Sequence, residues 1–144
     1  MDLRIYNQQK NLRILEHSMT PEKLSSFESE QIWLGTVILY GRAGFITDHG
    51  VCAEHFSSQI NGAIFTAISR VHNKRMAIEP TMVGRELEDM GWLDRVGGMP
   101  YIFELIKITS QSNAKHYADT IKRKHRERTA WAVMRDGMDA AASG

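Results

Sequence analysis

The residue types that most often carry chemistry gather in one short segment. His49, Cys52 and His55 follow a His-x-x-Cys-x-x-His spacing with Asp48 beside them, and imidazole, thiolate and carboxylate groups are all zinc ligands. A structural zinc site needs four ligands in a tetrahedron, and the remaining ligand is missing or distant in the sequence. One cysteine and neighbouring histidines in a helical turn are usually packed or surface residues. We therefore predict no metal site.

Pairs of carboxylates are the second candidate, because general acid–base catalysis often uses two of them. Glu28 with Glu30, and Glu86 with Glu88 and Asp89, have the spacing of an exposed helix surface. No histidine or nucleophile converges on either group in the sequence pattern. We expect these carboxylates to be solvated, and we predict no catalytic residue.

A phosphate-binding loop is absent, since no lysine follows a glycine anywhere in the 144 residues. The Gly-Lys-Ser/Thr loop uses backbone amides and its lysine to cradle a triphosphate. This chain is therefore not expected to hydrolyse ATP by that route, and we predict no cofactor in it.

The composition limits the classes of function and the cellular locations to expect. A formal net charge of +1 gives no global attraction to nucleic acid or membranes, and the single cysteine excludes an internal disulfide framework. The longest apolar stretch, Ile32 to Tyr40, is too short to span a bilayer, and Met1 to Lys10 does not resemble a signal peptide. We expect a soluble, cytoplasmic protein without a membrane partner.

Hydrophobic periodicity predicts helices throughout the chain, and no strand-like alternation is present. The expected helices cover residues 26–40, 59–73, 81–90, 99–108 and 113–142, with short turns over 43–56. Gly41 and Gly91 are expected to end two of them, and Gly97 with Gly98 to lead into the fourth. We predict an all-α fold in three parts: an N-terminal arm (1–25), a head of short helices (26–96) and an antiparallel helical hairpin (97–144).

The hairpin carries more apolar residues than a small head can cover. Residues 99–108 are hydrophobic on nearly every face, and further apolar residues follow from Trp131 onward. Pairing with a second copy is one explanation, and a purely internal core is the other. The expected self-association surface consists of Tyr101, Ile102, Leu105, Ile108, Tyr117, Ile121, Trp131, Met134 and Met138.

A basic run lies on the last expected helix. Its cationic residues are Lys122, Arg123, Lys124, Arg126 and Arg128. They are possible contacts for nucleic acid or an acidic partner, although no aromatic residues interleave with them to stack bases. A solvated helix face is the ordinary explanation. A small DNA-binding or accessory replication protein is therefore the alternative function.

Several motifs occur in a characteristic order over residues 26–128. They are Ser26-x-Glu28-x-Glu30-Gln31-x-x-Leu34-Gly35, then Ile64-Phe65, then Leu87-x-x-x-Gly91-x-Leu93-x-x-Val96-Gly97-Gly98-x-x-Tyr101-x-x-x-Leu105, and finally Asn113-Ala114-x-x-Tyr117-Ala118-x-x-Ile121. Together they resemble the N-terminal domain of DnaB-type replicative helicases. The sequence departs from that pattern at Asn61-Gly62-Ala63, where the family usually has a His-Arg pair, and its first two dozen residues match nothing in the family.

The resemblance implies a collar domain in a hexameric ring helicase. In that family the N-terminal domains pair through helical hairpins, dock primase and can contact a helicase loader. ATP and magnesium belong to a separate motor domain, and single-stranded DNA passes through the ring. The end of the chain at 140–144 falls where the family's linker begins, so we expect a fragment rather than a free-standing protein.

Overall fold

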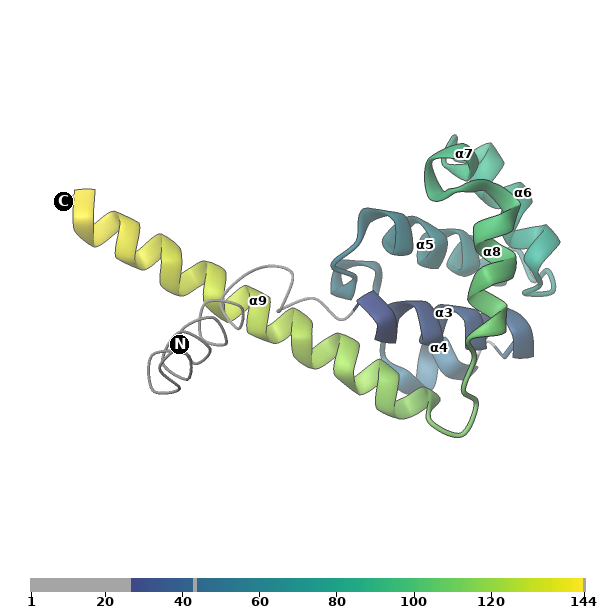
Figure 1. The fold of residues 1–144 in the computed structure, drawn as a ribbon, viewed down its shortest axis with the longest axis horizontal. Helices are drawn as coiled ribbons and strands as arrows, with labels where there is room; N and C mark the ends of the chain where they lie inside the picture. Colours follow the sequence, from purple (N-terminus) through teal and green to yellow (C-terminus); the bar gives the residue numbers. More distant parts are fainter. Residues whose placement is uncertain (1–26, 43, 144) are drawn as a thin grey trace, which may run out of the picture.

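The computed structural model describes residues 27–42 and 44–143, and these form helices and connections without a strand. The order is α3 (Phe27–Tyr40), α4 (Gly44–His49), the 3-10 turn η1 (Ala53–His55), α5 (Gln59–Asn73), α6 (Pro80–Asp89), α7 (Leu93–Val96), α8 (Gly98–Lys107) and α9 (Ala114–Ser143). Figure 1 shows α3 to α8 as a cluster from which α9 projects. The all-α prediction and the long C-terminal helix are confirmed, whereas the expected arm lies outside the described residues.

Helix α3 is the centre of the cluster. Six consecutive residues from Trp33 to Ile38 are buried, and six consecutive helical positions point in all directions around the axis. The helix is therefore covered on every side, by α5, α6, α8 and α9. Phe27, at the start of the helix, is an exception, because its side chain is 45% exposed.

Helices α8 and α9 do not form a closely packed hairpin. They follow each other through a short connection, as predicted, but each packs mainly on α3, and they diverge in Figure 1. The reason is visible at α3: Gly35 lies directly against the backbone of Leu105 in α8, and Thr36 accepts a hydrogen bond from the Ser110 amide at 3.0 Å. The central helix therefore occupies the space where the two would meet.

The entry into α8 depends on two glycines in the left-handed region. Gly97 has φ +108° and Gly98 has φ +71°. A Cβ at Gly98 would also lie 3.4 Å from Pro100 Cδ. A side chain here therefore costs backbone energy even though there is space for it.

We expect Gly98→Val to lower the free energy of unfolding by about 2 kcal/mol, because β-branched residues tolerate a positive φ poorly. Gly98→Asn should cost clearly less, since asparagine visits this region more readily. Thermal melts followed by circular dichroism measure both. Equal melting temperatures for wild type and Gly98→Val would show that glycine is not required at position 98.

None of the helices in the described part of the chain is long and apolar enough to cross a membrane.

Candidate interaction surfaces

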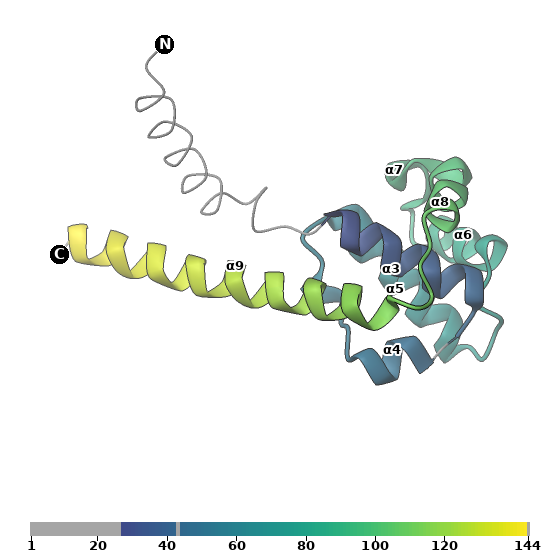
Figure 2. The same ribbon diagram turned by 60° about the horizontal axis from the view of Figure 1, so that its bottom comes forward.

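Helix α9 is anchored to the head by its first half. Ala114, Ala118 and Ile121 are all at most 2% exposed, and their spacing places them on one face of the helix. That face packs against α3, with α4 and η1 alongside. Beyond this contact the helix extends away from the head, as Figure 2 shows from a second direction. The fold therefore presents the second half of α9 as a projecting rod.

A buried carboxylate ties α3 to the start of α5. Glu30 is fully buried, and its Oε2 accepts hydrogen bonds from the Ser57 amide at 3.0 Å and the Ser57 hydroxyl at 2.6 Å. Its Oε1 accepts from the Ser58 amide at 3.4 Å and from Asn61 Nδ2 at 3.2 Å. Four donors thus compensate for burying this charge.

The same network reaches α8, and a hydrogen bond nearby joins α9 to η1. Tyr101 donates to Asn61 Oδ1 at 3.0 Å and accepts from Gln31 Nε2 at 3.2 Å. Burial raises the pKa of Tyr101, which therefore stays a hydrogen-bond donor. Arg128 Nη2 donates to the His55 carbonyl at 2.9 Å. Burial lowers the pKa of the Arg128 guanidinium, whereas attraction from Glu30 raises it. The bond from Arg128 holds the middle of α9 beside η1.

The expectation that the acidic groups are solvated is wrong for two of them. Glu30 is the centre of the network just described, and Glu86 is 6% exposed, with Lys74 Nζ 2.7 Å from its Oε2. Glu28, Glu88 and Asp89 are exposed, as expected. Helical spacing cannot distinguish these cases, because the donors that permit burial come from distant segments.

The residues predicted for self-association fall into two groups. Ile102, Leu105 and Ile121 are at most 1% exposed and belong to the head's own core, so in this conformation they offer no surface. Tyr101, Tyr117 and Trp131 are half-buried. Three members are open to solvent: Ile108 is 43%, Met134 57% and Met138 67% exposed.

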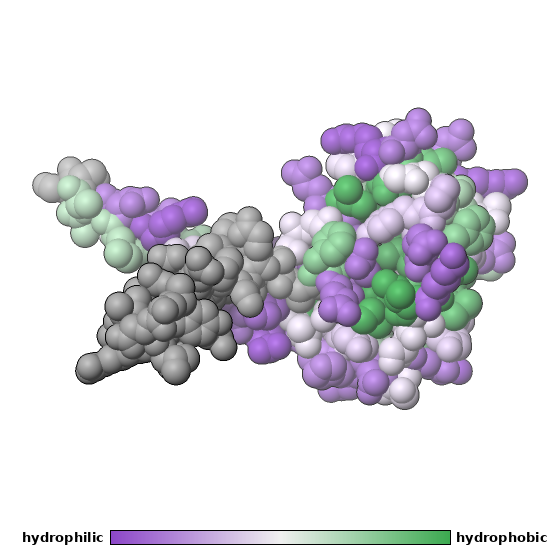
Figure 3. Space-filling view, in the orientation of Figure 1, coloured by the Kyte–Doolittle hydropathy of each residue, from purple (hydrophilic) through white to green (hydrophobic). Residues whose placement is uncertain are grey.

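Among the described residues, six further large apolar side chains outside that prediction are exposed: Phe27, Leu39, Tyr40, Met76, Phe103 and Val133. Val133 is 67% exposed beside Met134, and Phe103 on α8 is 46% exposed. In Figure 3 pale green side chains mark the far part of α9, and further green ones lie among polar residues on the head. A hollow along α9 is lined, among the described residues, by His125, Arg126, Thr129, Ala130, Val133 and Met134. The exposed large apolar side chains of α9 thus lie on its projecting half, and the others are spread over the head.

The basic run lies on α9 between the anchored and the projecting halves. Several of its cations have acidic neighbours on the same helix: Lys122 lies 3.6 Å from Asp119, and Lys124 lies 3.4 Å from Glu127. Arg123 lies 3.9 Å from the same Glu127. Surface pairs of this kind stabilise little, but they reduce the local positive potential.

The histidines near α4 are held by different partners. Trp33 is fully buried, and its indole N–H donates to His49 Nδ1 at 3.0 Å. Burial lowers the pKa of His49; Asp119 and Asp48 raise it, and Lys122 and Lys115 lower it. For His55 too, burial lowers the pKa, and the neighbouring His125 lowers it further.

Stability should therefore fall as the pH falls below the ordinary histidine pKa of 6.5. Folding favours neutral His49, so the unfolded chain takes up the proton first, and stability is lost as the pH drops through the lower folded-state pKa. We expect the melting temperature to fall between about pH 7 and 5. His49→Gln keeps an acceptor for Trp33 without titrating, so it should flatten the curve, whereas exposed His116→Gln should not. Identical slopes for all three proteins would contradict this role.

Comparison with known proteins agrees with this architecture. The family model for the DnaB-like helicase N terminal domain matches residues 22–123. The chain is 29% identical over 117 residues to the replicative DNA helicase DnaB of Geobacillus stearothermophilus, an alignment that covers 78% of this chain and 26% of that protein. The chain thus spans about a quarter of that relative's length.

A solved structure gives the same result. The crystal structure of the N-terminal domain of DnaB helicase from Mycobacterium tuberculosis superimposes with a TM-score of 0.69 at 26% identity, covering 77% of this chain and 82% of that one. The family match covers well over half of the 144 residues, including the central helix α3 and the first turns of α9. The chain belongs to the DnaB-like helicase N-terminal domain family.

Proposed function

We propose that this domain is a non-catalytic assembly unit of a replicative helicase. It pairs with a second copy of itself through α9, contributes to the collar of a hexameric ring, and offers a docking surface for primase and for a helicase loader. ATP hydrolysis with magnesium, and translocation on single-stranded DNA, then belong to a separate motor domain. Family membership and the likeness to a replicative helicase support this proposal.

The observation that carries the pairing step is the exposed apolar surface of α9. Val133, Met134 and Met138 are 57% to 67% exposed on a helix that projects beyond the head. Helical spacing puts them within one broad stripe. Exposed apolar stripes on a projecting helix are typical of helix–helix association. A two-fold contact would use this stripe on both chains.

We expect the double variant Met134→Lys, Met138→Lys to lower the mass of the oligomer while leaving helicity unchanged, because a charge is costly to bury in an interface but not on a free surface. Asp136→Lys is the matched control, since it puts the same side chain about 200° around the helix from position 134. Light scattering during size exclusion gives the mass, and circular dichroism the helicity. Loss of mass in the control as well would refute a contact specific to this stripe.

The alternative, DNA binding through the basic run, has weaker support. Three of its cations, Lys122, Arg123 and Lys124, lie within 4 Å of acidic side chains on α9 itself. Phosphate contacts would make binding fall steeply as salt rises. Titration with single-stranded and duplex DNA at two salt concentrations separates the two functions: tight, salt-sensitive binding by this domain would favour the alternative.

A further inference from the structure

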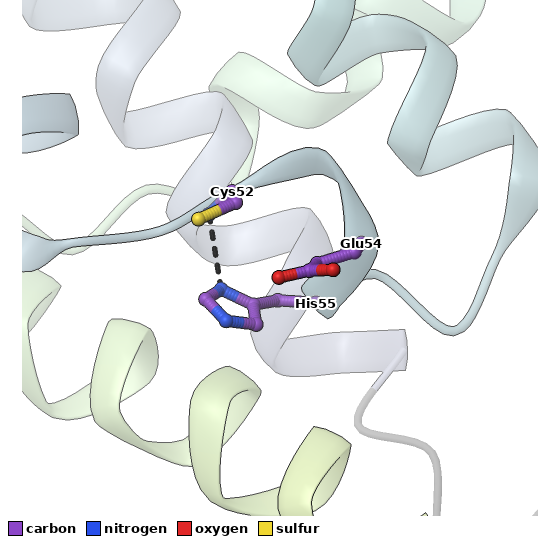
Figure 4. Close-up of side chains that lie close together, drawn as sticks. All are labelled: Cys52, Glu54 and His55. Atoms are coloured by element: carbon purple, nitrogen blue, oxygen red, sulfur yellow. Dashed lines mark hydrogen bonds between the residues drawn. The ribbon is translucent and has the colours of Figure 1, made fainter. Parts of the chain in front are cut away.

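The turn η1 presents three metal-ligating side chains on one side. The thiol of Cys52, the carboxylate of Glu54 and the imidazole of His55 each have a ligand atom within 4.8 Å of the other two. Figure 4 shows these side chains around the turn. His55 Nδ1 accepts a hydrogen bond from the Cys52 amide at 3.0 Å, so its lone pair points to the Cys52 side of the turn (Figure 4), and a metal ion bound to this nitrogen would replace that hydrogen bond.

The fold brings a second histidine, His125 on α9, close to His55. The rings of His55 and His125 have centroids 5.0 Å apart and meet edge to face at 62°. One helical turn further along α9, Arg128 donates to the carbonyl of His55 at 2.9 Å. The two segments are therefore held together at this point although they lie 70 residues apart in sequence. Tertiary structure thus brings a second imidazole beside this turn, which the sequence pattern alone did not show.

The chemistry of the set favours one class of cation. Cysteine sulfur, histidine nitrogen and a glutamate oxygen are the usual protein ligands of Zn²⁺ in four-coordinate sites. Thiolate and imidazole disfavour calcium and magnesium, which prefer oxygen. Zinc–ligand distances of about 2.0 to 2.3 Å require these exposed and half-buried side chains to move toward a common centre.

We propose that Cys52, Glu54, His55 and His125 form a Zn²⁺ site that fastens η1 to α9. On binding, the Cys52 thiol loses its proton to solvent, and the thiolate and the Glu54 carboxylate balance the charge of the ion. The site would fix the segment of α9 from which its projecting half extends. This proposal does not depend on the proposed function.

Cobalt is the direct probe, because Co²⁺ occupies zinc sites and a thiolate ligand gives it a charge-transfer band. We expect the reduced full chain to develop this band and visible tetrahedral bands at one Co²⁺ per chain, and Zn²⁺ to abolish them. Cys52→Ser should lose the charge-transfer band. His125→Ala should bind Zn²⁺ at least tenfold more weakly in competition with a chelator. The matched control is His116→Ala, an exposed histidine on the same helix, which should bind as wild type does.

Thermal melting with and without Zn²⁺ is a second test of the proposed site. Zn²⁺ should raise the melting temperature of wild type and of His116→Ala, because a ligand that binds the folded chain stabilises it. It should do so much less for His125→Ala. The proposal is overturned by the absence of the thiolate band, by equal zinc affinity of His125→Ala and wild type, or by binding that appears only at millimolar metal.

Discussion

Gly35→Ala is expected to lower the free energy of unfolding by about 3 kcal/mol, a fall in melting temperature of about 10 °C for a domain of this size. A Cβ at Gly35 would lie 2.0 Å from the carbonyl oxygen of Leu105 and 2.6 Å from its carbonyl carbon. Both atoms are backbone, so no side-chain rotation relieves the clash. The variant must move α8 away from α3 and disturb the centre of the core.

The matched control for this prediction is Gly137→Ala. Gly137 lies within α9, and a Cβ there meets nothing within 4 Å. The same substitution should therefore be neutral or stabilise by up to about 1 kcal/mol, since alanine favours helix. Urea or thermal unfolding measures both variants. If Gly35→Ala is as stable as Gly137→Ala, the close approach of α3 and α8 is wrong.

Glu30→Ala is expected to have a similarly large effect, about 3 kcal/mol or more. The substitution leaves the Ser57 amide and hydroxyl, the Ser58 amide and Asn61 Nδ2 without their common acceptor. These donors lie at the start of α5, where the Ser58 hydroxyl also caps the helix by accepting from the Asn61 amide. Loss of the carboxylate should therefore loosen the junction of α3 and α5.

The neighbouring Glu28 provides the control, because it lies on the same helix but is exposed. Glu28→Ala should change the free energy of unfolding by less than about 0.5 kcal/mol. Amide hydrogen exchange gives a local readout: Glu30→Ala should speed exchange at the start of α5, and Glu28→Ala should not. Equal stability of the two variants would show that the buried network is not needed.

The helices were largely predictable from the sequence, because periodicity and glycine stops are local signals. The helix expected over residues 59–73 matches α5, and the stop expected at Gly91 coincides with φ +74°. The entry into α8 was also expected at Gly97 and Gly98, and both have positive φ. These signals can be recognised without knowing which surface each helix packs against.

The packing was less predictable, since it depends on which distant segments meet. Residues 99–108 are apolar on nearly every face, so the sequence could not show that Ile102 and Leu105 face the core while Phe103 lies 46% exposed. The burial of Glu30 depends on donors 27 to 31 residues away. The contact of His55 with His125 depends on the course of α9. A pattern confined to one helix contains none of this information.

The resemblance to the DnaB family indicated one feature that helical propensity disfavours, a glycine inside α3. Glycine inside a helix is ordinarily unfavourable, yet Leu34-Gly35 is part of the motif, and the structure shows Gly35 against the backbone of α8. Asn61 stands where the family usually has part of a His-Arg pair, and here it joins Glu30 to Tyr101.

The most direct test of the central claim, that this domain assembles through α9, is the mass of the wild-type chain in sedimentation equilibrium across a range of concentrations. Pairing predicts a mass that rises with concentration to at least twice the 16.4 kDa of one chain, and the Met134→Lys, Met138→Lys variant should remain near the mass of one chain at the same concentrations. A wild-type mass that stays at 16.4 kDa into the high micromolar range would contradict the claim.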